Sequence, residues 1–128
     1  MVDFERFAQI LDELTNNLPK EIFVKLNGGV NLIYEAKEHP ESIDGSLSVL
    51  GDYNYNNLGR YINIYYGSFM GMFGHYSEEM LKGKIDHTLK HEFVHHLESL
   101  AGEKDLIIAD AQFIARYKAS LSDSCFSD

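Results

Sequence analysis

The chain has 128 residues, 45% of them hydrophobic, which suits one domain with a single core and is too little for two. Its 20 acidic and 11 basic residues give a formal net charge of -9. Because binding to phosphate backbones depends on Lys and Arg, we expect neither nucleic acid nor an anionic membrane surface as a partner. We expect one domain over residues 1–120, followed by a flexible tail over residues 121–128 that contains the single cysteine, Cys125.

The beginning of the chain differs from a signal peptide. The stretch MVDFERFAQILDEL carries acidic residues where a signal peptide needs basic ones followed by an apolar run. No window has the length and hydropathy of a membrane-spanning helix. The sequence therefore predicts a cytoplasmic protein.

The first predicted element is a helix that Asp3 can cap. Its apolar residues follow one another at steps of three and four, at Phe4, Phe7, Leu11, Leu14 and Leu18. Pro19 marks its end. The next segment, residues 19–26, is ambiguous, because Pro19 and Glu21 suit a helix start whereas the apolar run that follows suits a strand. We favour a helical turn.

About three strands follow this segment. Residues 30–35, 46–55 and 60–66 combine β-branched and aromatic residues, and stretches rich in Gly, Pro or charged residues separate them. The sequence NNLG joins the second strand to the third, and its Asn57 and Gly59 suit the positive φ angles of a hairpin connection. We expect the strands to form a short antiparallel or mixed sheet.

Two helices complete the predicted fold. Ser77 can cap the first and Gly102 suits its C-terminal cap, while apolar residues mark one side of it at Leu81, Ile85, Leu89, Phe93, Leu97 and Leu100. Asp105 can cap the second helix, whose apolar surface extends to Tyr117. A helix, a small sheet and two further helices make an α+β fold.

The stretch KHEFVHHLESLAG, residues 90–102, contains a candidate metal site. On a helix, His91 and His95 project from the same side with Cβ atoms about 5 to 6 Å apart, and two imidazoles at this spacing can bind one Zn²⁺. Glu92 is rotated by about 100° from His91 and can reach a water on the metal, which is the position of a general base. The alternative is a solvated helix face on which the histidines pair with nearby acids.

Two further histidines belong to the same predicted helix. We expect His96 in the core or behind a metal ligand. His87 lies one turn before His91 and is a candidate for stabilising the transition state, as are the eight tyrosines of the chain.

The third ligand of the site is open. Catalytic zinc usually has three protein ligands and a water. In the compact pattern HExxHxxGxxH, or the same pattern ending in Asp, a glycine turns the chain so that the last residue meets the metal. Here Glu98 takes the glycine position and Ala101 the ligand position. Gly102 and Asp105 restore the G-x-x-D spacing four residues later, so Asp105 is our first choice. The alternative is that Asp105 caps the last helix and does not bind the metal. Glu98 and Asp110 are the alternatives.

A resemblance to a known family rests on the segments FERF, LPKE, RYINIYYGSF, HEFVHH and GEKD. Over nearly the whole chain the sequence resembles the small, minimal zincin-like metallopeptidases of bacteria. The resemblance implies a minimal zincin-like α+β fold and peptidase chemistry that depends on one Zn²⁺. It also implies His91, His95 and Asp105 as metal ligands and Glu92 as the catalytic acid and base.

The expected activity is hydrolysis of a peptide or protein substrate by zinc-activated water, with Glu92 as general base. An extended substrate can pair with a sheet edge, and residues 60–66 are the strand we nominate. Two other functions stay open: a zinc-binding scaffold or regulatory domain that cleaves nothing, and a metal-dependent hydrolase of a non-peptide substrate. The sequence predicts no particular oligomeric state.

Overall fold

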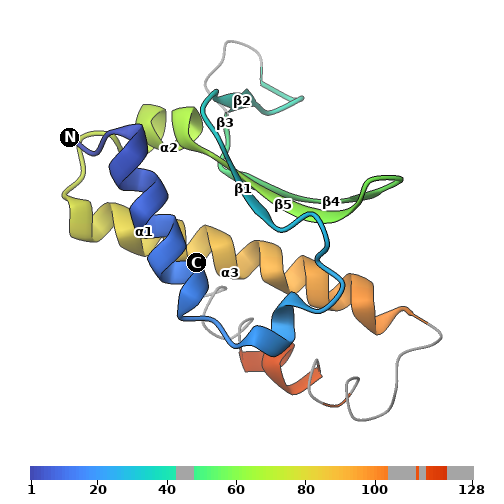
Figure 1. Cartoon of the computed structure of the whole chain (residues 1–128). Helices are drawn as coiled ribbons and strands as arrows, with labels where there is room; N and C mark the ends of the chain where they lie inside the picture. The colour runs from blue at the N-terminus through green and yellow to red at the C-terminus, as the bar shows by residue number, and fades with distance from the viewer. Residues whose placement is uncertain (43–47, 104–111, 113–114, 121–128) are drawn as a thin grey trace.

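The computed structural model describes residues 1–42, 48–103, 112 and 115–120. A long helix, α3 (Glu78–Ala101), runs along a three-stranded sheet, and a shorter helix, α1 (Phe4–Asn16), packs against α3 (Figure 1). The α+β class predicted from the sequence is confirmed. In the part of the chain that the structure describes, no helix is both long enough and apolar enough to cross a membrane.

Helix α1 forms where the sequence predicts it. The Asp3 carboxylate accepts a hydrogen bond from the backbone N–H of Arg6 at 2.8 Å, which caps the helix. One side of the helix is buried, at Phe7, Ile10, Leu11 and Leu14. The ambiguous segment that follows contains a short 3₁₀ helix, η1 (Lys20–Phe23), so the prediction of a helical turn is confirmed.

The main sheet is mixed and contains three strands. They are β1 (Val30–Ile33), β4 (Gly51–Asn56) and β5 (Gly59–Tyr65), in the order β1-β5-β4. β1 runs parallel to β5, and β4 runs antiparallel to it. Because β5 is paired on both sides, the nomination of residues 60–66 as a substrate-binding edge is wrong. Among the described strands, β4 lies at an edge of this sheet.

A tight connection joins β4 to β5. Gly59 has a φ of +106°, as predicted, but Asn57 does not have a positive φ, since Lys25 is the one non-glycine residue with a positive φ among those described. A Cβ on Gly59 would come within 2.1 Å of the side-chain amide nitrogen of Asn27. The other amide atom of Asn27, Oδ1, accepts a hydrogen bond from the backbone N–H of Arg60 at 2.9 Å. Gly59 is therefore required both for its φ and for this close approach.

The structure adds a second, two-stranded sheet that the sequence did not predict. It pairs β2 (Lys37–Glu38) with β3 (Ser48–Val49) in antiparallel orientation. The predicted strand over residues 46–55 is therefore two strands that belong to different sheets, and Leu50 separates them. The Leu50 carbonyl accepts a hydrogen bond from the backbone N–H of Tyr65 at 2.9 Å.

Helix α2 (Tyr66–Phe73) was also missed, and it ends the predicted third strand one residue early. The helix contains Gly67 and Gly71, which are poor helix formers, so propensity gave no signal for it. Tertiary contacts hold it in place. The backbone N–H of Gly67 donates to the Tyr34 carbonyl at 3.0 Å, and a Cβ on Gly67 would lie 2.5 Å from the backbone nitrogen of Ala36.

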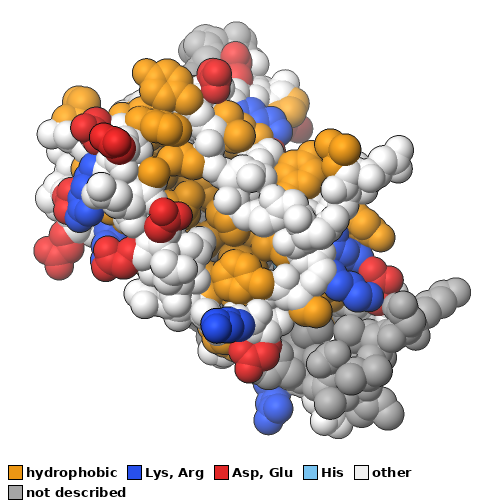
Figure 2. All heavy atoms as spheres, viewed as in Figure 1, with side chains coloured by type: hydrophobic (Ala, Val, Ile, Leu, Met, Phe, Trp, Pro, Cys, Tyr) orange, Lys and Arg blue, Asp and Glu red, His pale blue; other side chains and the backbone are white. Residues whose placement is uncertain are grey.

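An aromatic cluster connects α1 to the sheet and to α2. The ring of Phe4 lies 5.4 Å from that of Tyr34 and 5.3 Å from that of Tyr66, measured between centroids. Deeper in the molecule, Phe7 packs edge-on against Phe69. Figure 2 shows apolar side chains gathered between α1 and the sheet on this face, with charged side chains around them.

Helix α3 provides the largest share of the core. The Ser77 hydroxyl caps it by accepting from the backbone N–H of Met80 at 3.2 Å, and all six residues of the predicted apolar side are buried. Gly102 is the C-terminal cap as predicted, but its φ of -84° is one that any residue adopts. Residues 112 and 115–120 are helical, in agreement with the predicted last helix. Its predicted start at Asp105 and the predicted tail, residues 121–128, lie outside the described residues.

Candidate metal centre

His91 and His95 lie on one face of α3 with their Nε2 atoms 3.2 Å apart. The two rings are nearly perpendicular, at 88°, and their centroids are 4.8 Å apart. Two nitrogens bonded to one tetrahedral Zn²⁺ at about 2.0 to 2.1 Å are about 3.3 Å from each other, so the observed spacing fits a shared ion. It also fits a direct hydrogen bond between two neutral imidazoles.

Both histidines and Glu92 line one pocket of about 560 Å³ between α3 and the edge strand β4. The remaining lining residues are Gly51, Asp52, Tyr53 and Ser99. The structure therefore brings together the three residues of the HExxH motif for which the sequence predicts a chemical role.

Glu92 is buried, with 6% of its surface exposed. Burial raises the pKa of its carboxyl group to about 7, and the negative charge of Asp52 contributes to the increase. A carboxyl group with a pKa near the working pH can both accept and return a proton. The electrostatic environment of Glu92 thus suits a general base.

Asp52 was not identified from the sequence, although an acid within a predicted strand was a signal that could have been used. Its carboxylate accepts hydrogen bonds from Lys37 Nζ at 2.6 Å, from the Tyr65 hydroxyl at 2.9 Å and from Asn54 Nδ2 at 2.8 Å. Burial opposes its ionisation, but these three hydrogen bonds together lower its pKa. Asp52 is therefore held as an anion in the wall opposite Glu92.

His96 follows His95 directly but belongs to the core, where it is fully buried. Its Nε2 lies 2.9 Å from the carbonyl oxygen of Val24, and its Nδ1 lies 2.9 Å from the hydroxyl of Tyr53. Because a carbonyl only accepts, Nε2 carries the proton and Nδ1 accepts from Tyr53. Burial is the main cause that lowers the pKa of His96, to about 4. The predicted position of His96 behind the ligands or in the core is confirmed.

Arg60 connects the β4 wall of the pocket to the C-terminal end of α3 through hydrogen bonds. Its guanidinium donates to the Tyr53 hydroxyl at 3.2 Å, to the hydroxyl of Ser99 and to the carboxylate of Glu103. It also stacks on the ring of Tyr55, 3.8 Å from the centroid. The Tyr53 hydroxyl therefore accepts from Arg60 and donates to His96, so its hydrogen is already used within the fold.

The candidate third ligands differ in where they lie. One carboxylate oxygen of Glu98 is 3.4 Å from Nδ1 of His95 and the other is 3.2 Å from Lys118 Nζ. Glu98 thus faces the ring nitrogen that does not face His91, a position suited to orienting the imidazole. Asp105 and Asp110 lie outside the described residues. Within the residues that are described, no group of three or more His, Cys, Asp or Glu is arranged to hold a metal ion.

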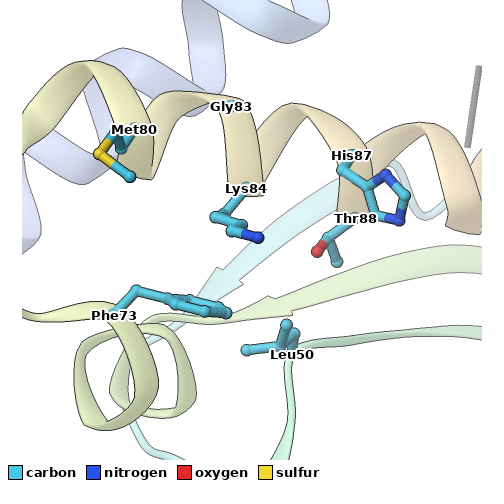
Figure 3. Close-up of a pocket in the computed structure, with 7 residues that line it drawn as sticks. All are labelled: Leu50, Phe73, Met80, Gly83, Lys84, His87 and Thr88. Carbon is cyan, nitrogen blue, oxygen red and sulfur yellow. The ribbon is translucent and has the colours of Figure 1, made fainter. Parts of the chain in front are cut away.

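His87 lies in a neighbouring pocket of about 570 Å³, with Leu50 and Phe73 among the residues that line it (Figure 3). It does not line the pocket that contains the His91 and His95 pair.

Comparison with known proteins relates this chain to a solved structure. No protein-family model matches the chain, and no curated protein matches it. A solved structure of a conserved hypothetical protein from Thermus thermophilus is similar, with a TM-score of 0.67 and 32% sequence identity. The match covers 78% of this chain and 98% of that one. The chain belongs to the same family as that conserved hypothetical protein.

Proposed function

We propose that this protein is a zinc-dependent peptidase with a minimal zincin-like fold. The observation that carries the proposal is the 3.2 Å distance between the Nε2 atoms of His91 and His95, together with the presence of Glu92 in the same pocket. The distance between the two Nε2 atoms would be the same at a structural metal site, so it does not by itself indicate catalysis. The buried carboxyl group of Glu92, which lines the same pocket as the histidine pair, is what favours a catalytic site over a structural one.

In this proposal His91 and His95 hold one Zn²⁺, and Asp105 completes the set of protein ligands, with Glu98 and Asp110 as alternatives. When bound, the ion supplies a Lewis acid for the scissile carbonyl and lowers the pKa of the attacking water. Glu92 takes the proton from that water and later gives it to the leaving amine. Glu98 holds the His95 ring in orientation through Nδ1.

The position of β4 supports an extended peptide as the substrate. This strand lies at an edge of the described sheet and forms the wall of the pocket opposite the histidines. An extended peptide can pair with such an edge through backbone hydrogen bonds, which brings a peptide bond over the motif. The small fold has no second subdomain to cover the pocket among its described elements, which suits access by a chain rather than enclosure of a small molecule.

Hydrolysis of a random peptide library by zinc-loaded protein, read by mass spectrometry, tests this function. We expect cleavage by the wild type, no cleavage after chelation, and recovery when zinc is restored. Glu92→Gln should lower the rate by about 100-fold or more while zinc binding is kept. Glu79→Gln, at an exposed acid on the same helix that does not line the pocket, is the matched control and should keep most of the activity. Zinc binding without any cleavage would instead support the scaffold function, and zinc-dependent cleavage of a non-peptide substrate alone would support the other hydrolase.

A further inference from the structure

A second cavity lies beside the candidate metal centre and has no role in the proposed chemistry. It has a volume of about 570 Å³, and its lining residues are Leu50, Phe73, Met80, Gly83, Lys84, His87 and Thr88 (Figure 3). Five of them belong to the N-terminal half of α3, Phe73 is the last residue of α2, and Leu50 directly precedes β4. The cavity is therefore built by the same helix and the same end of the sheet as the metal centre.

The two pockets continue one another along α3. The helix residues that line them, from Met80 to Ser99, repeat the i, i+3, i+4, i+7 pattern of one helix face. On the opposite wall, Leu50 of this cavity is next to Gly51 of the metal pocket. The walls approach at the junction, where a Cβ on Gly51 would lie 3.0 Å from Cγ2 of Thr88.

The spacing along α3 matches the length of a peptide residue or two. From His91 to His87 the helix advances four residues, about 6 Å, and an extended chain advances about 3.4 Å per residue. A peptide whose scissile bond lies over the histidine pair thus reaches the second cavity within two residues.

The lining has a definite chemical character. Leu50, Phe73 and Met80 are apolar, and in Figure 3 the side chains of Lys84 and Phe73 reach toward one another, with Lys84 Nζ 5.4 Å from the ring centroid. None of the described lining residues is acidic, in a chain with 20 acidic residues. A Cβ on Gly83 would meet nothing within 4 Å, so the absence of a side chain there keeps the cavity open.

We propose that this cavity is a side-chain subsite that selects a large apolar residue within two residues of the scissile bond. The proposal rests on the peptidase function. The apolar lining gains stability by covering such a side chain, and Met80 can adjust its flexible side chain to different shapes. Lys84 and the lack of an acid disfavour a Lys or Arg in the same place.

Filling the cavity tests the proposal. Gly83→Leu places a side chain in the open space, and Gly71→Leu is the matched control, because a Cβ there also meets nothing within 4 Å and Gly71 does not line the cavity. Zinc-loaded proteins are given blocked peptides that differ only in Phe, Leu, Gly or Lys at the residues around the scissile bond. We expect the wild type and Gly71→Leu to prefer Phe or Leu to Gly in kcat/KM by about 10-fold or more, with Lys the poorest. Gly83→Leu should reduce that ratio by about 10-fold.

Two outcomes of this assay overturn the subsite while the peptidase function stands. One is a ratio that Gly83→Leu and Gly71→Leu change equally. The other is a preference for Lys over Phe.

Binding to the Glu92→Gln protein separates failure of the subsite from failure of the peptidase function. A blocked tripeptide with Phe at its centre should shift the backbone amide resonance of Lys84 in NMR spectra, and its Gly counterpart should not. If no peptide is cleaved by the wild type but this shift occurs, the peptidase function is overturned and the apolar selectivity of the cavity is retained. If cleavage occurs and the Phe peptide causes no shift, the subsite is overturned.

Discussion

The hydroxyl of Tyr53 lies 2.9 Å from Nδ1 of His96, and this hydrogen bond joins the edge strand β4 to α3 behind the candidate metal centre. His96 and its neighbour His95 differ by about 100° around the helix axis, so one enters the core while the other lines the pocket. The bond to Tyr53, together with the one to the Val24 carbonyl, therefore fixes the rotation of α3 that presents His91 and His95 to the pocket.

Loss of the Tyr53 hydroxyl should destabilise the fold without removing a metal ligand. Tyr53→Phe leaves the buried Nδ1 of His96 without its donor, and we expect the free energy of unfolding to fall by about 1 to 3 kcal/mol. Tyr61→Phe is the control, because the Tyr61 hydroxyl accepts a single exposed hydrogen bond from Asn56. Urea denaturation measures both. Equal effects of the two substitutions would show that the buried bond has no special role.

Arg60 should be among the most sensitive polar positions. Its side chain is 5% exposed and pairs with Glu103, and it also holds Tyr53 and Ser99. Arg60→Met leaves these partners without their donor, so we expect a loss of about 2 to 4 kcal/mol in the free energy of unfolding. The exposed pair of Arg6 and Glu78 provides the comparison. Arg6→Met should cause a much smaller loss, and a loss as large as that of Arg60→Met would contradict this account.

Two glycine substitutions should change the stability of the protein in opposite directions. Gly59→Ala introduces a Cβ at a φ of +106° and against the side chain of Asn27, so we expect the protein to lose about 1 to 3 kcal/mol of stability. Gly71→Ala places a Cβ in open space inside α2 and should raise stability by up to about 1 kcal/mol. In thermal unfolding, the Tm of Gly59→Ala should lie below that of the wild type and the Tm of Gly71→Ala above it. A stabilised Gly59→Ala protein would show that the hairpin does not require the left-handed conformation.

Asp52 should make stability depend on pH in the acidic range. Burial alone would raise its folded pKa, but the hydrogen bonds from Lys37, Asn54 and Tyr65 together outweigh burial and lower the pKa. A lowered folded pKa stabilises the protein above the unfolded pKa of about 3.9, and that contribution is lost as the pH falls through the folded value. The stability difference between wild type and Asp52→Asn should therefore be largest at neutral pH and shrink below about pH 4. Asp12→Asn on the exposed side of α1 is the control, and a wild-type advantage that stays constant to low pH would contradict the prediction.

Local signals in the sequence were sufficient for the long helices. Asp3 and Ser77 cap the helices that they were predicted to cap, and the ridge from Leu81 to Leu100 is buried because its period matches the helix. Pairing between distant strands was not readable in the same way. Nothing in residues 60–66 shows that the strand is central, because that depends on β1 and β4 lying on its two sides.

The sequence predicted only those residues of the candidate site whose relative positions follow from helical spacing alone. His91 and His95 needed one regular turn of helix to meet, and the structure gives them that turn. Asp52 reaches the pocket only through the placement of β4 against α3, which no local pattern encodes. Helix α2 was missed for a related reason, since contacts of Gly67 with the chain around Ala36 hold it where propensity does not.

The metal content of purified protein tests the central claim most directly. After equilibration with zinc and removal of the excess, mass spectrometry of the wild type and of His75→Ala, an exposed histidine outside the site, should find one zinc ion per chain. His91→Ala should bind none under the same conditions. A wild type without zinc, or a His91→Ala protein that keeps it, would contradict the assignment of His91 and His95 as a metal-binding pair.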